Sequence, residues 1–157
     1  MDETELHPLY NVPQIQVTYR HPVPIFQRPK IRCSEDAARI ARETWDVNRI
    51  ELVEQFKILL LDRNYSCLGI SEIATGGIAG VLTDRRIIFA TALLSKATSI
   101  ILLHNHPSGV LAASEPDKKM TRELFAAGKV LDIHVADHMI LTSNKYYSFA
   151  DEGIMPD

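Results

Sequence analysis

Residues 104–117 carry the side chains of this sequence that are best suited to chemistry. His104, His106 and Asp117 offer two imidazole nitrogens and a carboxylate within the segment His-Asn-His-Pro-Ser-Gly-Val-Leu-Ala-Ala-Ser-Glu-Pro-Asp. Because side chains two apart in an extended chain point the same way, we expect the two imidazoles on one face and Asn105 on the other. Three such ligands leave a fourth position for water, as in catalytic zinc sites. The spacing therefore predicts a zinc-dependent hydrolase.

Two elements are expected to bring these ligands together. Residues 99–103 form a short apolar run that predicts a buried strand ending at the histidines. A helix is then predicted to begin near Ser114, a good N-cap, with Pro116 and Asp117 in its first turn, and to end at Gly128. Ser114 could act as a helix cap, as a functional hydroxyl, or as both.

Hydrolysis by a zinc-bound water also needs a base, and glutamate is the usual choice. The candidates by residue type are Glu43, Glu51, Glu54, Glu72, Glu115 and Glu123. Glu51 and Glu54 lie in a polar stretch before a strand, which favours a solvated surface. Glu72 lies instead in the apolar, strand-like run 67–73, where an acid needs a partner. This surrounding sets Glu72 apart from the other glutamates.

The order of these residues resembles that of a known family. Glu72 followed by His-x-His-x7-Ser-x2-Asp, from His104 to Asp117, resembles the motif of the JAMM (MPN-type) metallopeptidases. Within that group, His-Asn-His-Pro-Ser-Gly, the later Asp-His-Met-Ile at 137–140 and Tyr-Ser-Phe-Ala-Asp-Glu-Gly at 147–153 resemble the RadC family of bacterial proteins. The resemblance covers residues 50–154 and so extends well beyond the metal motif.

The resemblance implies that His104, His106 and Asp117 bind zinc. It also implies that Glu72 holds and activates a water molecule and that Ser114 helps to stabilise the oxyanion of a tetrahedral intermediate. The implied reaction is cleavage of a peptide or isopeptide amide bond in a peptide or protein substrate. RadC-like chains usually have proline where this chain has Ala113, which changes the stiffness of the loop and leaves the ligands intact.

Two alternative functions stay open. RadC proteins carry a historical DNA-repair label, but the net charge of −3 gives no general attraction to DNA, and we find no helix-hairpin-helix segment of the kind that longer RadC proteins carry. The second alternative is a metal-stabilised interaction module without turnover. The presence of all the ligand and base positions argues against such a module. A chain of 157 residues is too short for the eight βα units of an amidohydrolase barrel.

Intermixed strand and helix patterns predict an α/β or α+β fold with a mixed sheet flanked by helices, and the resemblance implies a JAB/MPN-like, cytidine deaminase-like sandwich. The other expected strands are 56–62, 67–73, 130–135, 138–142 and 146–149, with a break at 136–137, and the other expected helices are 35–45, capped by Ser34, and 83–97. Five of the eight prolines precede residue 30. They predict an extended arm over residues 1–30, with an edge strand at 14–19, before a domain at 31–157.

Further expectations concern partners and location. The arm could pair with a sheet edge or join a second copy of the chain. The sequence has no apolar run of 18 residues and begins with acidic residues, so we expect a cytoplasmic protein without a membrane partner. Asp137 and His138 form either a pair that orients the metal ligands or a structural hydrogen-bonded pair.

Overall fold

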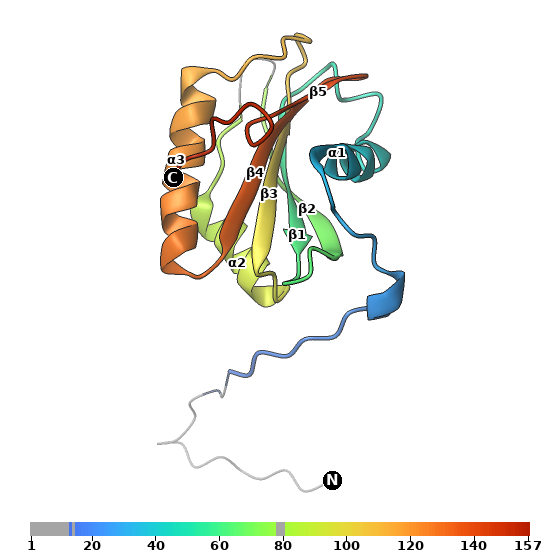
Figure 1. The fold of residues 1–157 in the computed structure, drawn as a ribbon, viewed down its shortest axis with the longest axis vertical. Helices are drawn as coiled ribbons and strands as arrows, with labels where there is room; N and C mark the ends of the chain where they lie inside the picture. The colour runs from blue at the N-terminus through green and yellow to red at the C-terminus, as the bar shows by residue number, and fades with distance from the viewer. Residues whose placement is uncertain (1–12, 14, 78–80) are drawn as a thin grey trace, which may run out of the picture.

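A mixed β-sheet forms the centre of the computed structural model, which describes residues 13, 15–77 and 81–157 (Figure 1). Its strands lie in the spatial order β2-β1-β3-β4-β5. β3 and β4 run parallel, whereas each of the other neighbouring pairs is antiparallel. The strands are β1 (Gln55–Leu61), β2 (Cys67–Thr75), β3 (Ser99–Asn105), β4 (His134–Leu141) and β5 (Tyr146–Ser148).

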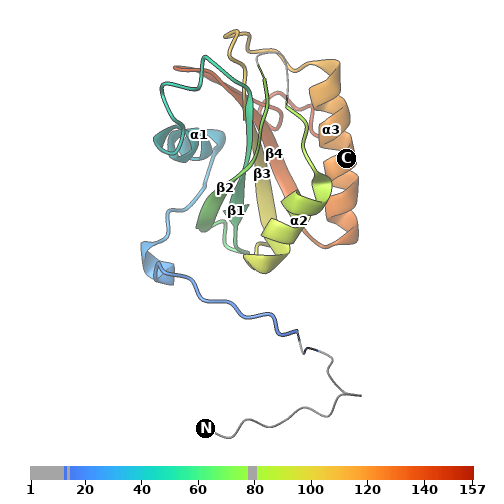
Figure 2. The ribbon, with the colours of Figure 1, turned by 180° about the vertical axis from the view of Figure 1, so that it is seen from behind.

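Helices cover both faces of this sheet. Helix α1 (Ser34–Glu43) packs on one face, and α2 (Arg85–Leu94) and α3 (Glu115–Val130) lie on the other (Figures 1 and 2). The central strands β1 and β3 are buried along their whole length, as expected of strands with helices on both faces. The predicted α/β class with a mixed, helix-flanked sheet is confirmed.

The side chains of β3 point alternately to the two faces of the sheet. Ile101 and Leu103 belong to the core beneath α1, whereas Ile100 and Leu102 belong to the core beneath α2 and α3. Because side chains alternate in a strand, His104 continues the second series and Asn105 the first. The end of β3 therefore presents a histidine toward the α2/α3 face of the sheet.

Helix α3 begins as the sequence predicted and ends later. Ser114 is its N-cap: the Ser114 hydroxyl accepts a hydrogen bond from the Asp117 amide, and the Asp117 carboxylate accepts one from the Ser114 amide. The predicted end at Gly128 is wrong, because the helix continues to Val130. Gly128 is required for a different reason: a Cβ atom there would collide with the carbonyl oxygen of Ile133, where the chain turns into β4.

Two other predicted boundaries are also corrected. The break at 136–137 is absent from β4, which continues from His134 to Leu141 and absorbs one extra residue as an irregularity opposite Ile100 and Ile101. Helix α1 takes Cys33 rather than Ser34 as its N-cap residue. The Ser34 hydroxyl donates instead to the Asp151 carboxylate, a partner distant in sequence.

Residues 15–20 extend away from the domain, whereas Lys30 forms an antiparallel bridge with Ser66, directly before β2 (Figure 1). The predicted edge strand is wrong over residues 15–19, where no strand is formed, while position 14 lies outside the described residues. Ile15 and Val17 are exposed, at 92% and 73%. The first side-chain hydrogen bond to the sheet comes from the His21 imidazole to the Leu68 carbonyl oxygen, at 2.7 Å. No helix among the described residues is long and apolar enough to cross a membrane.

Candidate metal centre

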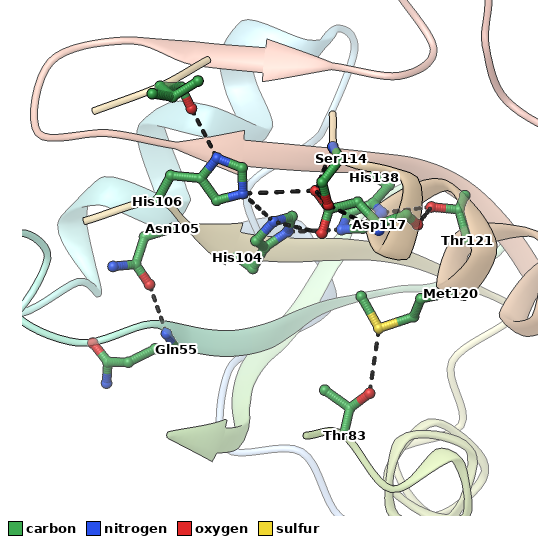
Figure 3. A network of polar contacts seen from close by, with 11 residues as sticks. Gln55, Thr83, His104, Asn105, His106, Ser114, Asp117, Met120, Thr121 and His138 are labelled. Carbon is green, nitrogen blue, oxygen red and sulfur yellow. Dashed lines mark hydrogen bonds and ion pairs between the residues drawn. The ribbon is translucent and has the colours of Figure 1, made fainter. Parts of the chain in front are cut away.

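The structure brings His104, His106 and Asp117 together at the end of β3 (Figure 3). The Nε2 atoms of the two imidazoles lie 2.9 Å apart, and the Asp117 oxygens lie 3.3 Å from His104 Nε2 and 3.7 Å from His106 Nε2. Asn105 points to the other face, where its side chain accepts a hydrogen bond from the Gln55 amide. The prediction that both imidazoles share one face is confirmed.

The sheet fixes the positions of the two histidines. His104 lies between β1 and β4, and its ring stacks on Phe56 with centroids 6.4 Å apart. His106 follows β3 directly, and its amide donates to the Leu141 carbonyl oxygen at 3.0 Å. Asp117 comes from the first turn of α3. The cluster therefore joins a core strand to the start of the following helix, as the sequence predicted.

The hydrogen bonds around His106 define which of its ring atoms faces the cluster. His106 Nδ1 lies 2.8 Å from the Val110 carbonyl oxygen, which can only accept a hydrogen bond. Nδ1 therefore carries the proton, and a lone pair on Nε2 faces His104 and Asp117 in the neutral ring. Acceptor atoms that converge in this way need a proton or a cation between them. Two imidazole nitrogens and a carboxylate suit zinc in an open site.

The pKa values of the cluster describe it without a metal, when an imidazole that carries a proton on Nε2 donates to Asp117. Burial alone would raise the pKa of Asp117, but hydrogen bonds from His104 and His106 outweigh it and hold that pKa well below its ordinary value. The hydrogen bond with Asp117 is the largest influence on His106 and raises the pKa of its imidazole. Asp117 is thus ionised over the whole physiological range, as a metal ligand must be.

Ser114 lies beside the cluster and is bonded to one of its members. Its hydroxyl donates to Asp117 Oδ2 at 2.6 Å, in addition to its role as the helix cap. This contact fixes the Asp117 carboxylate toward the histidines. The stabilisation of an oxyanion by Ser114 stays a prediction, because that role requires the hydroxyl to turn from Asp117 toward a substrate.

Glu72 has its polar partners outside this cluster. Its carboxylate accepts hydrogen bonds from Gln55 Nε2 at 2.9 Å and Thr75 Oγ1 at 2.6 Å, and it lies 3.8 Å from Lys57 Nζ. The Lys57 ammonium also donates to the Thr44 carbonyl oxygen, directly after α1. The structure thus gives Glu72 the partner that its apolar strand requires, and that partner is a lysine.

The register of β1 shows why Glu72 and the histidines are separated. Lys57 pairs with Glu72, whereas the preceding residue, Phe56, pairs with His104. Because neighbouring residues of a strand face opposite sides, Lys57 and Glu72 lie on the α1 face and His104 on the α2/α3 face.

Glu54 is the acid that shares a cleft with the metal cluster. A cleft of about 320 Å³ is lined by Glu54, His106, Pro107, Ser108, Val110, Ala112 and Ser114. Continuing the antiparallel register of β1 and β3 by two residues, from Phe56 opposite His104, sets Glu54 opposite His106. The Glu54 charge is among the influences that raise the pKa of His106. Two backbone hydrogen bonds to Gly76 and Gly77 hold Glu54 in place.

The polar stretch in which Glu54 lies favours a solvated surface when the sequence is considered alone. Two observations together identify Glu54: it directly precedes the buried strand β1, and β1 pairs with β3, the strand that ends at the histidines. Pairing between β1 and β3 is a long-range contact, which the residue pattern alone does not reveal. Phe56 pairs with His104, and the Gln55 amide donates to the Asn105 side chain, so the place of Glu54 beside His106 can be recognised only once that pairing is known.

Comparison with known proteins agrees with a mixed α/β domain. The chain belongs to the RadC-like JAB domain family, whose sequence model matches residues 31–154. The matched range contains the whole sheet and the metal cluster.

Relatives of this chain occur in several bacteria. It is 45% identical over 101 residues to a UPF0758 protein of Flavobacterium johnsoniae, which covers 64% of this chain and 44% of the relative. It is 35% identical over 126 residues to a UPF0758 protein of Syntrophomonas wolfei (80% and 54%) and 36% identical over 128 residues to one of Desulfitobacterium hafniense (82% and 55%). The chain spans about half the length of these curated relatives.

Proposed function

We propose that this chain is a zinc-dependent hydrolase that cleaves peptide or isopeptide amide bonds. The observation that carries the proposal is the convergence of His104 Nε2, His106 Nε2 and the Asp117 carboxylate beside a cleft that His106 lines together with Glu54 and Ser114. Zinc held by these ligands would polarise a carbonyl group and lower the pKa of a water molecule.

Glu54 is the general base of this proposal, in place of Glu72. Glu54 lines the cleft beside His106, and in this proposal its carboxylate accepts a proton from water and returns it to the departing amine. Glu72 cannot take this role from the α1 face while Gln55, Thr75 and Lys57 hold it. Pro107, Val110 and Ala112 supply a small apolar wall that suits an extended peptide segment.

A matched pair of glutamine variants tests the assignment. Purified wild-type protein should bind about one zinc ion per chain, and His104→Ala or Asp117→Ala should lose it. Glu54→Gln should keep the zinc and lose hydrolysis of a panel of peptide and isopeptide amides by about 100-fold or more, while Glu72→Gln keeps both. Loss of activity in Glu72→Gln alone would refute the assignment of Glu54.

The same preparation tests the alternative functions. A DNA-associated protein would be retained on DNA in a salt-dependent manner and would cleave none of the amides. A metal-stabilised interaction module would bind zinc without any turnover. Either result would overturn the proposed hydrolase.

A further inference from the structure

A buried chain of hydrogen bonds lies behind His104, on the side away from His106 (Figure 3). His104 Nδ1 is 2.8 Å from His138 Nε2, and His138 Nδ1 is 2.6 Å from Thr121 Oγ1. Thr121 Oγ1 in turn lies 2.7 Å from the Asp117 carbonyl oxygen. His138 is 0% exposed and Thr121 is 1% exposed, so solvent does not reach this chain. The chain begins at one proposed zinc ligand and ends at the backbone of another.

The direction of each hydrogen bond follows from the fixed end of the chain. A backbone carbonyl only accepts, so the single hydroxyl proton of Thr121 goes to the Asp117 carbonyl oxygen. The Thr121 oxygen must then accept from His138 Nδ1, which carries a proton. Since a neutral imidazole has one N–H group, His138 Nε2 is an acceptor and His104 Nδ1 is its donor.

We infer that Thr121 and His138 are positioning residues that hold His104 in the tautomer protonated at Nδ1, with the Nε2 lone pair directed toward the metal. This inference rests on the proposed zinc site. The inference also gives His138 a role at the proposed metal centre, because its imidazole accepts the hydrogen bond from His104 Nδ1. The Asp137 carboxylate accepts from the His138 backbone amide and from Ser148, and so supports the strand rather than the ring.

The surroundings of His138 favour the neutral ring that this arrangement requires. The His138 side chain is completely buried, and burial disfavours a charged imidazole. Its ring also packs against Phe149, with centroids 4.7 Å apart. His106 needs no such chain, because the Val110 carbonyl oxygen fixes its tautomer directly. Changes at His138 should therefore act on the ring of His104 and leave the tautomer of His106 unchanged.

Nuclear magnetic resonance of the zinc-free protein gives a test that does not depend on activity. In a ¹⁵N-labelled sample, two-bond proton–nitrogen correlations distinguish histidines protonated at Nδ1 from those protonated at Nε2. We expect His138 to be protonated at Nδ1 only and His104 to carry a proton at Nδ1. A His138 ring protonated at Nε2 would make it a donor to His104 and would overturn the inference.

Threonine variants supply the second test, with zinc chloride as the probe and a chromophoric chelator as competitor. Thr121→Val keeps the shape but removes the acceptor for His138 Nδ1–H, so it should weaken zinc binding about 10- to 100-fold, although Thr121 does not touch the metal. Thr121→Ser, which retains the hydroxyl, should bind zinc as the wild type does. Equal affinity of Thr121→Val and wild type, with an unchanged histidine spectrum, would refute the inference.

A second pair of variants keeps the test decisive if the valine variant folds poorly. His138→Gln offers an amide oxygen to His104 and an amide N–H to Thr121, and it should bind zinc more tightly than His138→Leu. The thermal midpoint of each zinc-free variant reports on folding separately. If wild-type protein itself binds no zinc, the proposed function fails, whereas the tautomer measurement stands on its own.

Discussion

Glu54 and Glu72 are the same kind of side chain in different surroundings. Glu72 lies among Gln55, Thr75 and the buried ammonium group of Lys57, so its charge is compensated and its orientation fixed. Glu54 shares a cleft with His106 and Ser114. At the scale of single residues, the face of the sheet therefore distinguishes the two carboxylates and favours Glu54 as the base of the proposed hydrolysis.

Lys57 provides a pH-dependent test of the pair on the α1 face. Burial is the largest influence on this group and lowers its pKa below the ordinary 10.5, despite the opposing effect of Glu72. A depressed lysine pKa means that the folded state binds the proton less tightly than the unfolded state, so folding is penalised below the folded-state pKa. The penalty disappears as the pH rises through the folded-state value toward 10.5.

We therefore predict that wild-type protein gains stability relative to Lys57→Met between pH 7 and pH 10.5. Urea unfolding of both proteins at several pH values measures the difference in the free energy of unfolding, in which the other titrating groups cancel. Lys129→Met, at an exposed end of α3, is the control for the replacement of a lysine by methionine. A constant difference across this range would mean that Lys57 titrates normally.

Side-chain hydrogen bonds also connect whole elements, and Asn105 is the main example. Its buried side chain accepts from the Gln55 amide at 2.7 Å and donates to the carbonyl oxygens of Ile50 and Val53 at 2.7 and 2.9 Å. Asn105 therefore links residues 50–55, the segment that contains Glu54, to the end of β3. One asparagine thus aligns the proposed base with the proposed metal ligands.

Replacing Asn105 should separate stability from metal binding. Asn105→Ala leaves several buried backbone groups without partners, which should lower the free energy of unfolding by about 2–3 kcal/mol. Because Glu54 loses its alignment while the zinc ligands stay, hydrolysis should fall more than zinc affinity does. Urea unfolding and zinc titration measure the two effects, with exposed Asn144→Ala as the control. Equal losses of both properties would contradict the proposed alignment.

Local chemistry explains which elements could be predicted from the sequence. His104, His106 and Asp117 were predicted because strand alternation and helix capping act over a few residues. Glu54, the continuous β4 and the close packing at Gly128 depend on contacts between segments distant in sequence. The same holds for Thr121, whose link to His104 passes through a histidine of another strand.

At the scale of the whole molecule, the described part of the arm before α1 meets the domain mainly at its end. Lys30 forms an antiparallel bridge with Ser66, and the Pro29 carbonyl oxygen accepts from the Cys67 amide, whereas Ile15 and Val17 are exposed. Replacing Ile15 and Val17 by serine should therefore change the thermal midpoint by less than about 2 °C. The expectation that the arm joins a second copy stays a prediction: sedimentation at several concentrations should then show self-association of the wild-type chain that the double serine variant lacks.

Metal removal is expected to affect the molecule as a whole, because the ligands join two of its layers. His104 belongs to the central sheet and Asp117 to the helical layer formed by α2 and α3, and the converging acceptor atoms oppose one another when no cation is bound. Zinc at about 100 times its Kd should stabilise the folded state by about 2.7 kcal/mol. For a domain of this size, a chelator should lower the thermal midpoint by roughly 5–10 °C. Scanning calorimetry with and without zinc measures this shift, and His104→Ala should show none, since it lacks a ligand. If zinc shifted the thermal midpoint of wild-type protein and of His104→Ala equally, the metal would bind at a site other than this cluster.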